Sequence, residues 1–302
     1  PEVKAFEEEF SAHFGLGRAC VAVNSGTSGL HLGLLAAGVG PGDEVIVPSF
    51  TFAATANSVA ITGATPVFAD IEREHFCLDP ASVEAAITDR TRAIMPVHMN
   101  GLNCDMDRLM AVCDKADLPV IEDCAHTMGA AWKGVPSGRH GVMGCYSTQT
   151  YKHMNSGEGG LIVSDDADLM AKAIILSGSY MLYPRHRAAP PPEAFEAVKY
   201  VTPNVSGRMD NLRAAILRPQ LADLPRQCAR WNALYRTVEA GLRSTPGLTL
   251  IDRPDGEQYV ASSFQFLLPD WPEAKVRAVL ARAAARGVEL KWFGAKEPQG
   301  FT

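Results

Sequence analysis

The chain has 302 residues, of which 47% are hydrophobic and 21% charged, a composition typical of a globular protein with one or two domains. Its net charge is −6, from 28 Lys and Arg against 34 Asp and Glu, so no overall attraction draws it to nucleic acid or to an anionic membrane. Its apolar stretches are too short to cross a bilayer, and no signal peptide is expected because Pro1 opens directly into Glu-rich sequence.

The first half of the sequence alternates strands with helices, after a lead-in helix at Pro1–Phe14. Short, nearly continuous apolar runs predict strands at Ala19–Val23, Glu44–Pro48, Pro66–Asp70, Ala93–His98, Pro119–Glu122, Gly144–Ser147 and Leu161–Ser164. Helices are predicted between them at Ser28–Gly38, Phe52–Gly63, Pro80–Thr88 and Asp105–Ala116. Apolar strands of this kind suit a sheet covered on both faces. The predicted fold is therefore a layered α/β domain with a mostly parallel sheet of seven strands.

The second half is predicted to be mainly helical and to end in a smaller α+β region. After a helix that begins near Ala167, the predicted elements are a Pro-rich loop at Tyr183–Pro192, a long helix at Arg208–Ser244 bent at Pro219 or Pro225, a strand at Ser262–Leu268 and a helix at Trp271–Arg286. We expect residues 1–220 to form a large domain and residues 221–302 a smaller C-terminal domain. The smaller domain looks truncated, because Gly294–Thr302 stops without a closing element.

Seven cysteines are scattered along the chain with no repeated spacing. Their odd number and the size of the chain argue against a disulfide framework and predict the reduced thiols of a cytoplasmic protein. No metal site is expected from Cys104, Cys113, Cys124, His98 and His126, because the tight CxxC and HxxxH spacings of zinc sites are missing.

The first candidate site motif is Asn24–Ser28, between a predicted strand and a predicted helix. Gly26 permits a close approach of the backbone, and Thr27 and Ser28 offer hydroxyl groups beside the unpaired N–H groups of the helix start. A dianion such as a phosphate can bind there without a basic side chain. The alternative is that these residues only cap the helix, a position that Ser and Thr favour in any protein.

Two further candidates follow later strands. Phe52 comes just after a strand and could stack on a flat cofactor ring, although most phenylalanines simply pack in a core. Asp123 ends an apolar strand, with His126 three residues later. A carboxylate at this place can hold the protonated nitrogen of a pyridine ring, as in sites for pyridoxal phosphate (PLP). Otherwise, Asp123 would be a helix cap or a metal ligand.

The fourth candidate is Lys152, which lies between a strand and the glycine-rich turn Gly157–Gly160. A lysine that is partly removed from water binds its proton less tightly and becomes an amine nucleophile. The alternative is a solvated surface lysine. Ser147, at the end of the same strand, could join Thr27 and Ser28 on a phosphate.

Around these residues the sequence resembles the DegT/DnrJ/StrS family of sugar aminotransferases. The similarity runs from about Val3 to Leu221 and continues weakly to Val288. The strongest matches are Asn24–Ser28, Pro41–Pro48, Thr51–Asn57, Pro96–His98, Glu122–His126 and Ser147–Gly160.

The resemblance implies a type I PLP-transferase fold and a homodimer with active sites at the interface. It implies Lys152 as the Schiff-base lysine, Asp123 as the partner of the pyridine nitrogen and Phe52 as the stacking residue. His126 falls where a residue contacts the phenolic oxygen of the cofactor. The positions that it implies for phosphate binding are Gly26, Thr27, Ser28 and Ser147. The family's Gly-x-Asn-x-Arg-Met stretch, whose Asn reaches the phosphate of the neighbouring subunit, corresponds to Asn204–Met209; Asn204 lies two residues early, and Ser206 stands at the Asn position.

The implied function is a PLP-dependent aminotransferase that moves an amino group from glutamate or glutamine to a keto-sugar, commonly nucleotide-linked, by a ping-pong mechanism. A PLP-dependent sugar dehydratase is the nearest alternative, but dehydratases of the family replace the lysine with His. A non-catalytic PLP-fold protein would not need the pair of Lys152 and Asp123. The absence of GxGxxG after the first strand argues against a nucleotide-dependent dehydrogenase. The loop Tyr180–Pro192, with Arg185, His186 and Arg187, could contact a phosphate or carboxylate of the substrate or could simply be solvated.

Overall fold

A seven-stranded sheet forms the centre of the protein. The computed structural model describes residues 1–17 and 20–296, so Ala19 of the first predicted strand and residues 297–302 of the predicted open end lie outside the described residues. Two groups of strands make up the sheet: β1 (Val21–Val23), β9 (Gly160–Val163), β8 (Met143–Ser147) and β5 (Ile121–Asp123), followed by β4 (Thr91–Ile94), β2 (Glu44–Pro48) and β3 (Thr65–Ala69). Parallel bridges from Ile94 to Val120 and from Val97 to Asp123 join β4 to β5.

The prediction of a mostly parallel sheet is confirmed. Among the described strands of this sheet, β9 alone runs antiparallel to its neighbours, β1 and β8. The pairs of β5 with β8 and of β2 with β3 and β4 are all parallel. Because parallel strands end at the same edge of a sheet, the residues that follow β1, β2, β5 and β8 gather at one edge.

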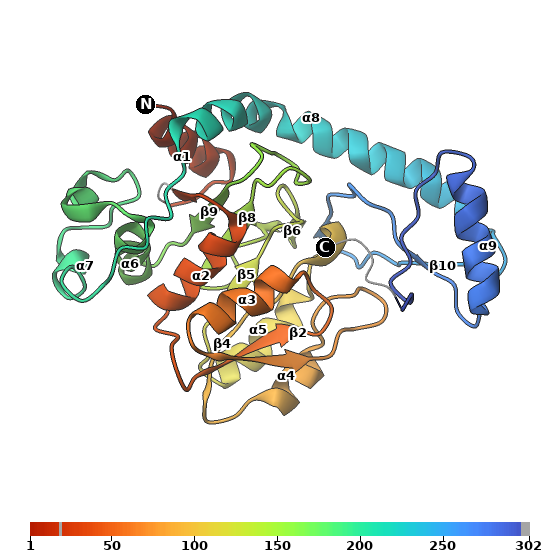
Figure 1. Cartoon of the computed structure of the whole chain (residues 1–302), viewed down its shortest axis with the longest axis horizontal. Coiled ribbons are helices and arrows are strands. Elements are labelled where there is room, and N and C mark those ends of the chain that lie inside the picture. Colours follow the sequence, from red (N-terminus) through yellow and green to blue (C-terminus); the bar gives the residue numbers. More distant parts are fainter. Residues whose placement is uncertain (18–19, 297–302) are drawn as a thin grey trace.

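Helices cover both faces of the sheet (Figure 1). One face packs against α2 (Gly26–Ala36), α3 (Ala53–Ile61) and α6 (Ala167–Ser177). The other face packs against α1 (Glu2–His13) and α8 (Asn211–Leu242) beside β1, and against α4 (Pro80–Ala86) and α5 (Met106–Lys115) beside β4. The strands are buried on both sides because successive side chains point to opposite faces, which explains their nearly continuous apolar sequences.

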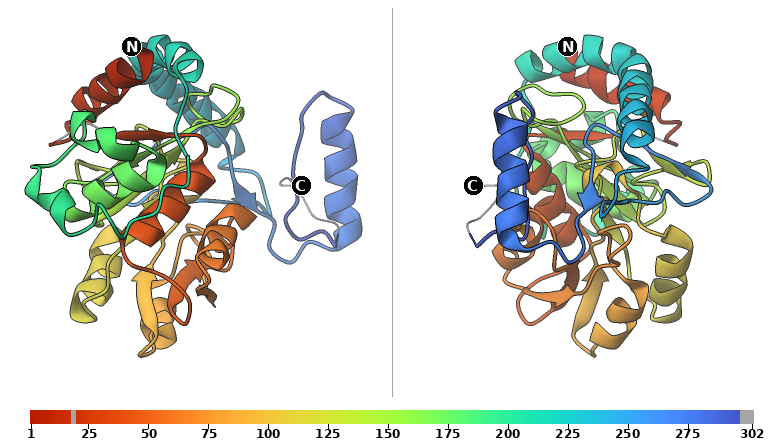
Figure 2. Two further views of the ribbon diagram at one scale, coloured as in Figure 1. Left: turned by 60° about the vertical axis from the view of Figure 1, so that its left-hand side comes forward. Right: turned by 90° about the vertical axis from the view of Figure 1, so that its right-hand side faces the viewer.

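The helix α8 links this part of the chain to the C-terminal elements. It is one helix of 32 residues that contains both Pro219 and Pro225 and passes position 220 without a break. Beyond it lie α9 (Glu273–Ala284) and the antiparallel pair of β10 (Thr249–Leu250) and β12 (Phe266–Leu267). In Figure 1, α8 runs along one side of the molecule toward α9, and Figure 2 shows α9 standing off from the central sheet.

Several short elements were not predicted from the sequence. The strands β6 (Ala131–Trp132), β7 (Val135–Pro136) and β11 (Glu257–Gln258) form a small antiparallel sheet. Each has two residues, too few to show a hydrophobic period. The remaining short elements are helical turns: η1 (Met99–Gly101), η2 (Tyr180–Arg185) and α7 (Glu193–Glu196).

Candidate active site

The first motif forms the start of α2 at the edge of the sheet. Ser25 has an extended backbone and is the N-cap: its Oγ accepts a hydrogen bond from the Ser28 N–H at 3.0 Å and donates one to the Ser28 Oγ at 2.9 Å. The helix therefore begins at Gly26, two residues earlier than predicted, and Thr27 and Ser28 lie in its first turn. Capping is done by Ser25, so the hydroxyl of Thr27 is not needed for it.

Gly26 brings this helix start against the end of β8. A Cβ atom at Gly26 would lie 2.8 Å from the Cβ of Ser147, closer than side chains can pack. Ser147 itself is buried and its Oγ accepts a hydrogen bond from the Gln149 N–H at 3.3 Å. Two segments far apart in the sequence thus meet at the positive end of a helix, where a phosphate dianion is favoured.

Phe52 is not a core residue. It occupies the N-cap position of α3 and is 43% exposed, so the alternative of a simply packed phenylalanine is wrong. The same helix contributes Thr55, which is fully buried and donates a hydrogen bond from Oγ1 to Oδ2 of Asp123 at 3.1 Å. The start of α3 therefore carries both an exposed aromatic residue and a hydroxyl group that contacts a buried carboxylate.

Asp123 ends β5 and is 6% exposed. Its Oδ1 accepts a hydrogen bond from the Ala125 N–H at 3.1 Å. Burial raises its pKa, while the Ala125 N–H, the charge of Lys152 and the Thr55 hydroxyl act in the opposite direction. A buried carboxylate of this kind is stabilised by a cation placed against it.

Lys152 lies on the turn after β8, with its backbone N–H donating to the Gln149 carbonyl at 2.9 Å. The side chain is partly buried, and burial lowers its pKa while the negative charge of Asp123 raises it. The structure thus brings Lys152 and Asp123 within electrostatic reach of each other. The alternative of a freely solvated surface lysine does not hold.

His126 belongs to the same group of side chains. Its Nδ1 accepts a hydrogen bond from the Asn100 N–H at 3.3 Å, so the neutral ring carries its proton on Nε2. Burial, together with the charges of Lys152 and His153, lowers its pKa to about 3. His126 is therefore a neutral hydrogen-bond donor at physiological pH.

The segment of Asn204 and Ser206 lies beside the end of β1, since the Asn24 N–H donates to the Gly207 carbonyl at 2.7 Å. Both residues are exposed. Within the chain, Oδ1 of Asn204 accepts a hydrogen bond from the Ser206 N–H at 2.8 Å. Oγ of Ser206 accepts one from Nη2 of Arg208 at 3.0 Å.

The basic loop after α6 is held by the first helix. His186 lies 3.3 Å from Glu7, and Arg187 lies 3.0 Å from Glu8, both on α1. Arg187 is therefore paired within the chain, and His186 lies beside a buried carboxylate. Arg185 of the same loop is exposed, so a contact of this loop with a negatively charged substrate stays a prediction.

Ser25 and Thr55 were missed as site residues by sequence reasoning. Ser25 could have been recognised as an N-cap, because serine favours that position and Ser25 directly precedes the Gly-Thr-Ser sequence that opens the helix. Thr55 carries no comparable signal, because its role depends on α3 and β5 meeting in space.

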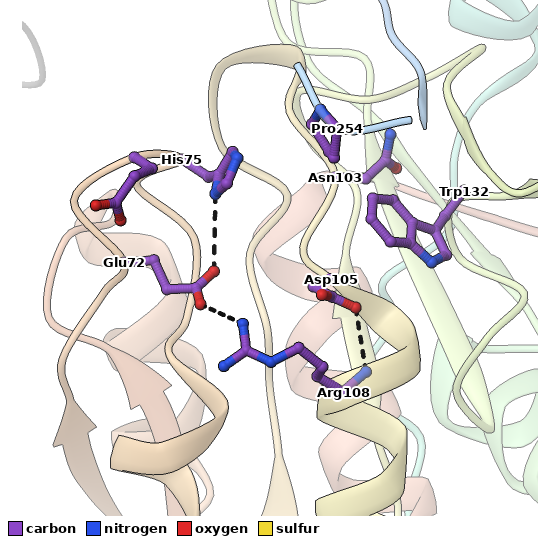
Figure 3. Close-up of a pocket in the computed structure, with 8 residues that line it drawn as sticks. Glu72, His75, Asn103, Asp105, Arg108, Trp132 and Pro254 are labelled. Carbon is purple, nitrogen blue, oxygen red and sulfur yellow. Dashed lines mark hydrogen bonds and ion pairs between the residues drawn. The ribbon is translucent and has the colours of Figure 1, made fainter. Parts of the chain in front are cut away.

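A cavity of about 90 Å³ lies at a different place in the molecule (Figure 3). Glu72 pairs there with Arg108 at 2.5 Å and lies 3.8 Å from His75. The lining residues are Glu72, Glu74, His75, Asn103, Asp105, Arg108, Trp132 and Pro254. None of the predicted site residues lines this cavity.

The site combines a helix start suited to phosphate, an exposed aromatic ring, a buried carboxylate and a partly buried amine. The helix start can lie this close to Ser147 only because position 26 has no side chain. These residues fit a phosphorylated pyridine ring, and the arrangement defines the class of type I PLP-dependent transferases. Within the described ranges 1–17 and 20–296, no helix combines the length and apolar character needed to span a membrane.

Residues 1–295 match the family model of the DegT/DnrJ/EryC1/StrS aminotransferase family, and the chain belongs to this family. It is 45% identical over 216 residues to GDP-perosamine synthase of Caulobacter vibrioides, covering 72% of this chain and 55% of that protein. It is 45% identical over 172 residues to L-glutamine:scyllo-inosose aminotransferase of Streptomyces griseus, covering 56% of this chain and 41% of that protein. The chain thus spans about half the length of these relatives. The solved structure of S. venezuelae DesV superposes with a TM-score of 0.83 at 34% identity, covering 96% of this chain and 73% of that one.

Proposed function

We propose that this chain is a PLP-dependent aminotransferase that moves an amino group from glutamate or glutamine to a keto-sugar. The observation that carries the proposal is the pairing of Lys152 with Asp123 at the edge of the sheet where the helix start of α2 also lies. Membership in an aminotransferase family supports it. The cofactor, when bound, supplies an electron sink for the electrons released at the α-carbon of the amino donor.

Each residue of the site has a distinct role in this proposal. Lys152 would hold the cofactor through its amine and would carry a proton to and from the reacting carbon of the donor. Burial lowers the pKa of the Lys152 amine, which favours the neutral form relative to a lysine in water. Asp123 would keep the ring nitrogen protonated, and Nε2–H of His126 could donate toward the phenolic oxygen. Phe52 would stack on the ring.

The phosphate group would be held by the start of α2 together with Ser147. The N–H groups of Gly26 and Thr27 and the hydroxyls of Thr27 and Ser28 supply donors without a formal charge. Asn204 is a candidate for reaching the phosphate of a second subunit, because it is exposed and lies beside the end of β1.

The substrate, the assembly and the compartment are further parts of the proposal. The relatives named GDP-perosamine synthase and L-glutamine:scyllo-inosose aminotransferase support a keto-sugar or inosose as amino acceptor and glutamine as a possible donor. Exposed apolar side chains at Tyr200, Val201 and Leu212 are candidate contacts with a second copy of the chain and support a homodimer. Seven free cysteines support the reducing cytoplasm.

Lys152→Ala tests the proposed function directly. The wild-type chain, incubated with PLP, should gain the visible absorbance of a lysine-bound cofactor and should lose it when glutamate or glutamine is added. The Ala variant should show neither change and no amino transfer to a keto-sugar. A fully active Lys152→Ala variant would refute the proposal.

A further inference from the structure

A second buried polar cluster lies directly behind Asp123, and the chemistry described above does not use it. Its members are His98 and Glu122, both 0% exposed. Nε2 of His98 lies 2.9 Å from Oε2 of Glu122. Glu122 precedes Asp123 on β5, so the two carboxylates point to opposite faces of the sheet.

The hydrogen bonds of this cluster define its protonation. The N–H of Cys104 donates to Nδ1 of His98 at 3.1 Å, so the neutral imidazole donates its Nε2 proton to Glu122. Three backbone N–H groups, at positions 138, 140 and 141, donate to the same carboxylate at 2.7 Å each. Burial alone would raise the pKa of Glu122, but the bonds from His98 and from this loop outweigh it and lower the pKa. Glu122 is thus a fully paired buried anion.

The sulfur of Cys124 completes a group of three possible metal ligands, all within 4.8 Å of one another. A metal ion would need acceptor positions that are already filled. Both nitrogens of His98 are engaged, and the Glu122 carboxylate accepts four hydrogen bonds. Burial also raises the pKa of the Cys124 thiol, which disfavours the thiolate that a metal requires. The cluster is a hydrogen-bond network and not a ligand set.

The network is tied to Asp123 through the backbone. The Asp123 N–H donates to the Pro96 carbonyl at 2.9 Å, and the His98 N–H donates to the Asp123 carbonyl at 3.1 Å. The bond between the side chains of His98 and Glu122 therefore reinforces the same contact of β4 with β5. Together these bonds resist any shift or twist at the end of β5.

The same carboxylate also fixes the loop 137–141 beneath β8. A Cβ at Gly144 would collide with Gly138, and the hydroxyl of Tyr146 donates to the Ser137 carbonyl. β8 therefore rests on this loop, and β8 ends at Ser147. Glu122 thus connects the strand end that carries Asp123 with the strand end that carries Ser147.

We propose that His98 and Glu122 are positioning residues that set the spacing between Asp123, which faces the ring nitrogen, and Ser147, which faces the phosphate. This inference rests on the proposed function, because both anchors belong to the proposed cofactor site. It assigns the buried pair a role in cofactor geometry and not in any proton transfer.

The experiment compares two substitutions of His98. His98→Gln keeps an N–H donor toward Glu122 and an oxygen acceptor for Cys104, whereas His98→Leu removes both. The measurements are the dissociation constant for PLP, from fluorescence titration, and the ¹⁵N resonance of the ring nitrogen in labelled bound PLP. Leu109→Ala is the control, because Leu109 is buried in the adjacent core and belongs to none of these hydrogen bonds.

His98→Leu should weaken PLP binding about tenfold or more, since it leaves a buried anion short of a donor, and should move the ring resonance toward that of an unprotonated pyridine. His98→Gln should restore both values. Leu109→Ala should lower thermal stability and leave both values unchanged. If His98→Leu does not fold, Glu122→Gln takes its place with the same two measurements and the same expected changes. The amide of Gln keeps the volume of the side chain and replaces one hydrogen-bond acceptor with a donor.

The two levels of failure are distinguishable. A wild-type chain that binds no PLP would overturn the proposed function, and this inference with it. A wild-type chain that binds normally, with His98→Leu and Leu109→Ala behaving alike, would overturn the positioning role alone.

Discussion

Lys152 and Asp123 stabilise each other's charged forms in a place where burial disfavours both. Burial lowers the pKa of Lys152 and raises that of Asp123, and in each case the partner's charge acts against burial. The Lys152 amine is therefore easier to deprotonate than a lysine in water, and the charge of Asp123 offsets part of this effect. Removing either partner must therefore change the titration of the other.

Asp123→Asn preserves the shape of the side chain and removes its charge. We expect the rate of amino transfer to fall about 10²-fold or more, because the ring nitrogen loses the carboxylate that keeps it protonated. The pKa of Lys152 should fall further, since only the effect of burial remains. Steady-state kinetics and the pH dependence of lysine modification in the cofactor-free chain measure the two effects. Asp114→Asn, on the exposed side of α5, should change neither.

Gly26→Ala tests whether the start of α2 binds phosphate. The added Cβ would press on Ser147, so the helix start and the end of β8 would have to move apart. The affinity for PLP should fall about tenfold or more, as measured by equilibrium titration, because the phosphate donors lose their alignment. Gly40→Ala is a matched control, since a Cβ there meets no atom within 4 Å. Equal affinities for the two variants would contradict the assignment.

Glu7 and Glu8 form a natural comparison of a buried and an exposed carboxylate. Glu7 is 2% exposed, and its Oε1 accepts a hydrogen bond from the Ala22 N–H at 3.0 Å. Glu7→Ala leaves this buried donor unpaired and should therefore lower the free energy of unfolding by about 1–3 kcal/mol. Glu8 pairs with Arg187 at the surface, so Glu8→Ala should cost about 0–1 kcal/mol. Urea unfolding measures both. Equal losses would show that the Glu7 carboxylate does not hold β1.

The low pKa of His126 predicts a specific acid sensitivity of the cofactor-free chain. Its pKa is about 3 in the folded chain, against the usual 6.5. The unfolded chain binds a proton first, so the free energy of unfolding should fall as the pH drops from 6.5 toward 3, by up to about 1.4 kcal/mol per pH unit. His126→Gln should flatten this slope between pH 6.5 and 3. Above pH 6.5 residue 126 is uncharged in both states, so the substitution should not alter how stability depends on pH there. An unchanged slope in chemical denaturation at several pH values would show that His126 titrates normally.

Val201→Arg tests the proposed homodimer. Val201 is 78% exposed and its chain neighbour Tyr200 is 81% exposed, so these two side chains present apolar surface to solvent in the single chain. A charge placed in a contact that excludes water would be unpaired, and the variant should sediment as a monomer where the wild type sediments as a dimer. Val288→Arg, near the C-terminal end and 51% exposed, should leave the dimer intact.

The fold could be predicted in large part because buried parallel strands have distinctive sequences. In the run Glu44–Pro48 every residue after Glu44 is apolar, and the strand occupies those same residues. The start of α2 was placed two residues late, because Gly26 is a poor helix former by propensity and its place in the helix depends on the cap at Ser25. The two-residue strands β6 and β11 depend on pairing between distant segments and could not be predicted from local sequence.

The active site could be predicted from the sequence where a role requires one particular residue type. A lysine beside a glycine-rich turn and an aspartate ending an apolar strand both pointed to the chemistry that their neighbourhood supports. The hydrogen-bond partners of these residues could not be predicted from the sequence. Nothing in the local sequence marks Thr55 or His98 as a partner of the site. Only the meeting of α3 with β5, and of the segment after β4 with β5, shows what these two side chains touch.

The continuity of α8 has a mechanical consequence. A helix of 32 residues is ~48 Å long, so a tilt of about 5° near Asp210 would displace its far end by about 4 Å. No loop at position 220 absorbs such a tilt, and the first turns of α8 lie close to the segment of Asn204 and Ser206. Small adjustments beside the phosphate site would therefore be amplified into ångström-scale travel of the C-terminal elements.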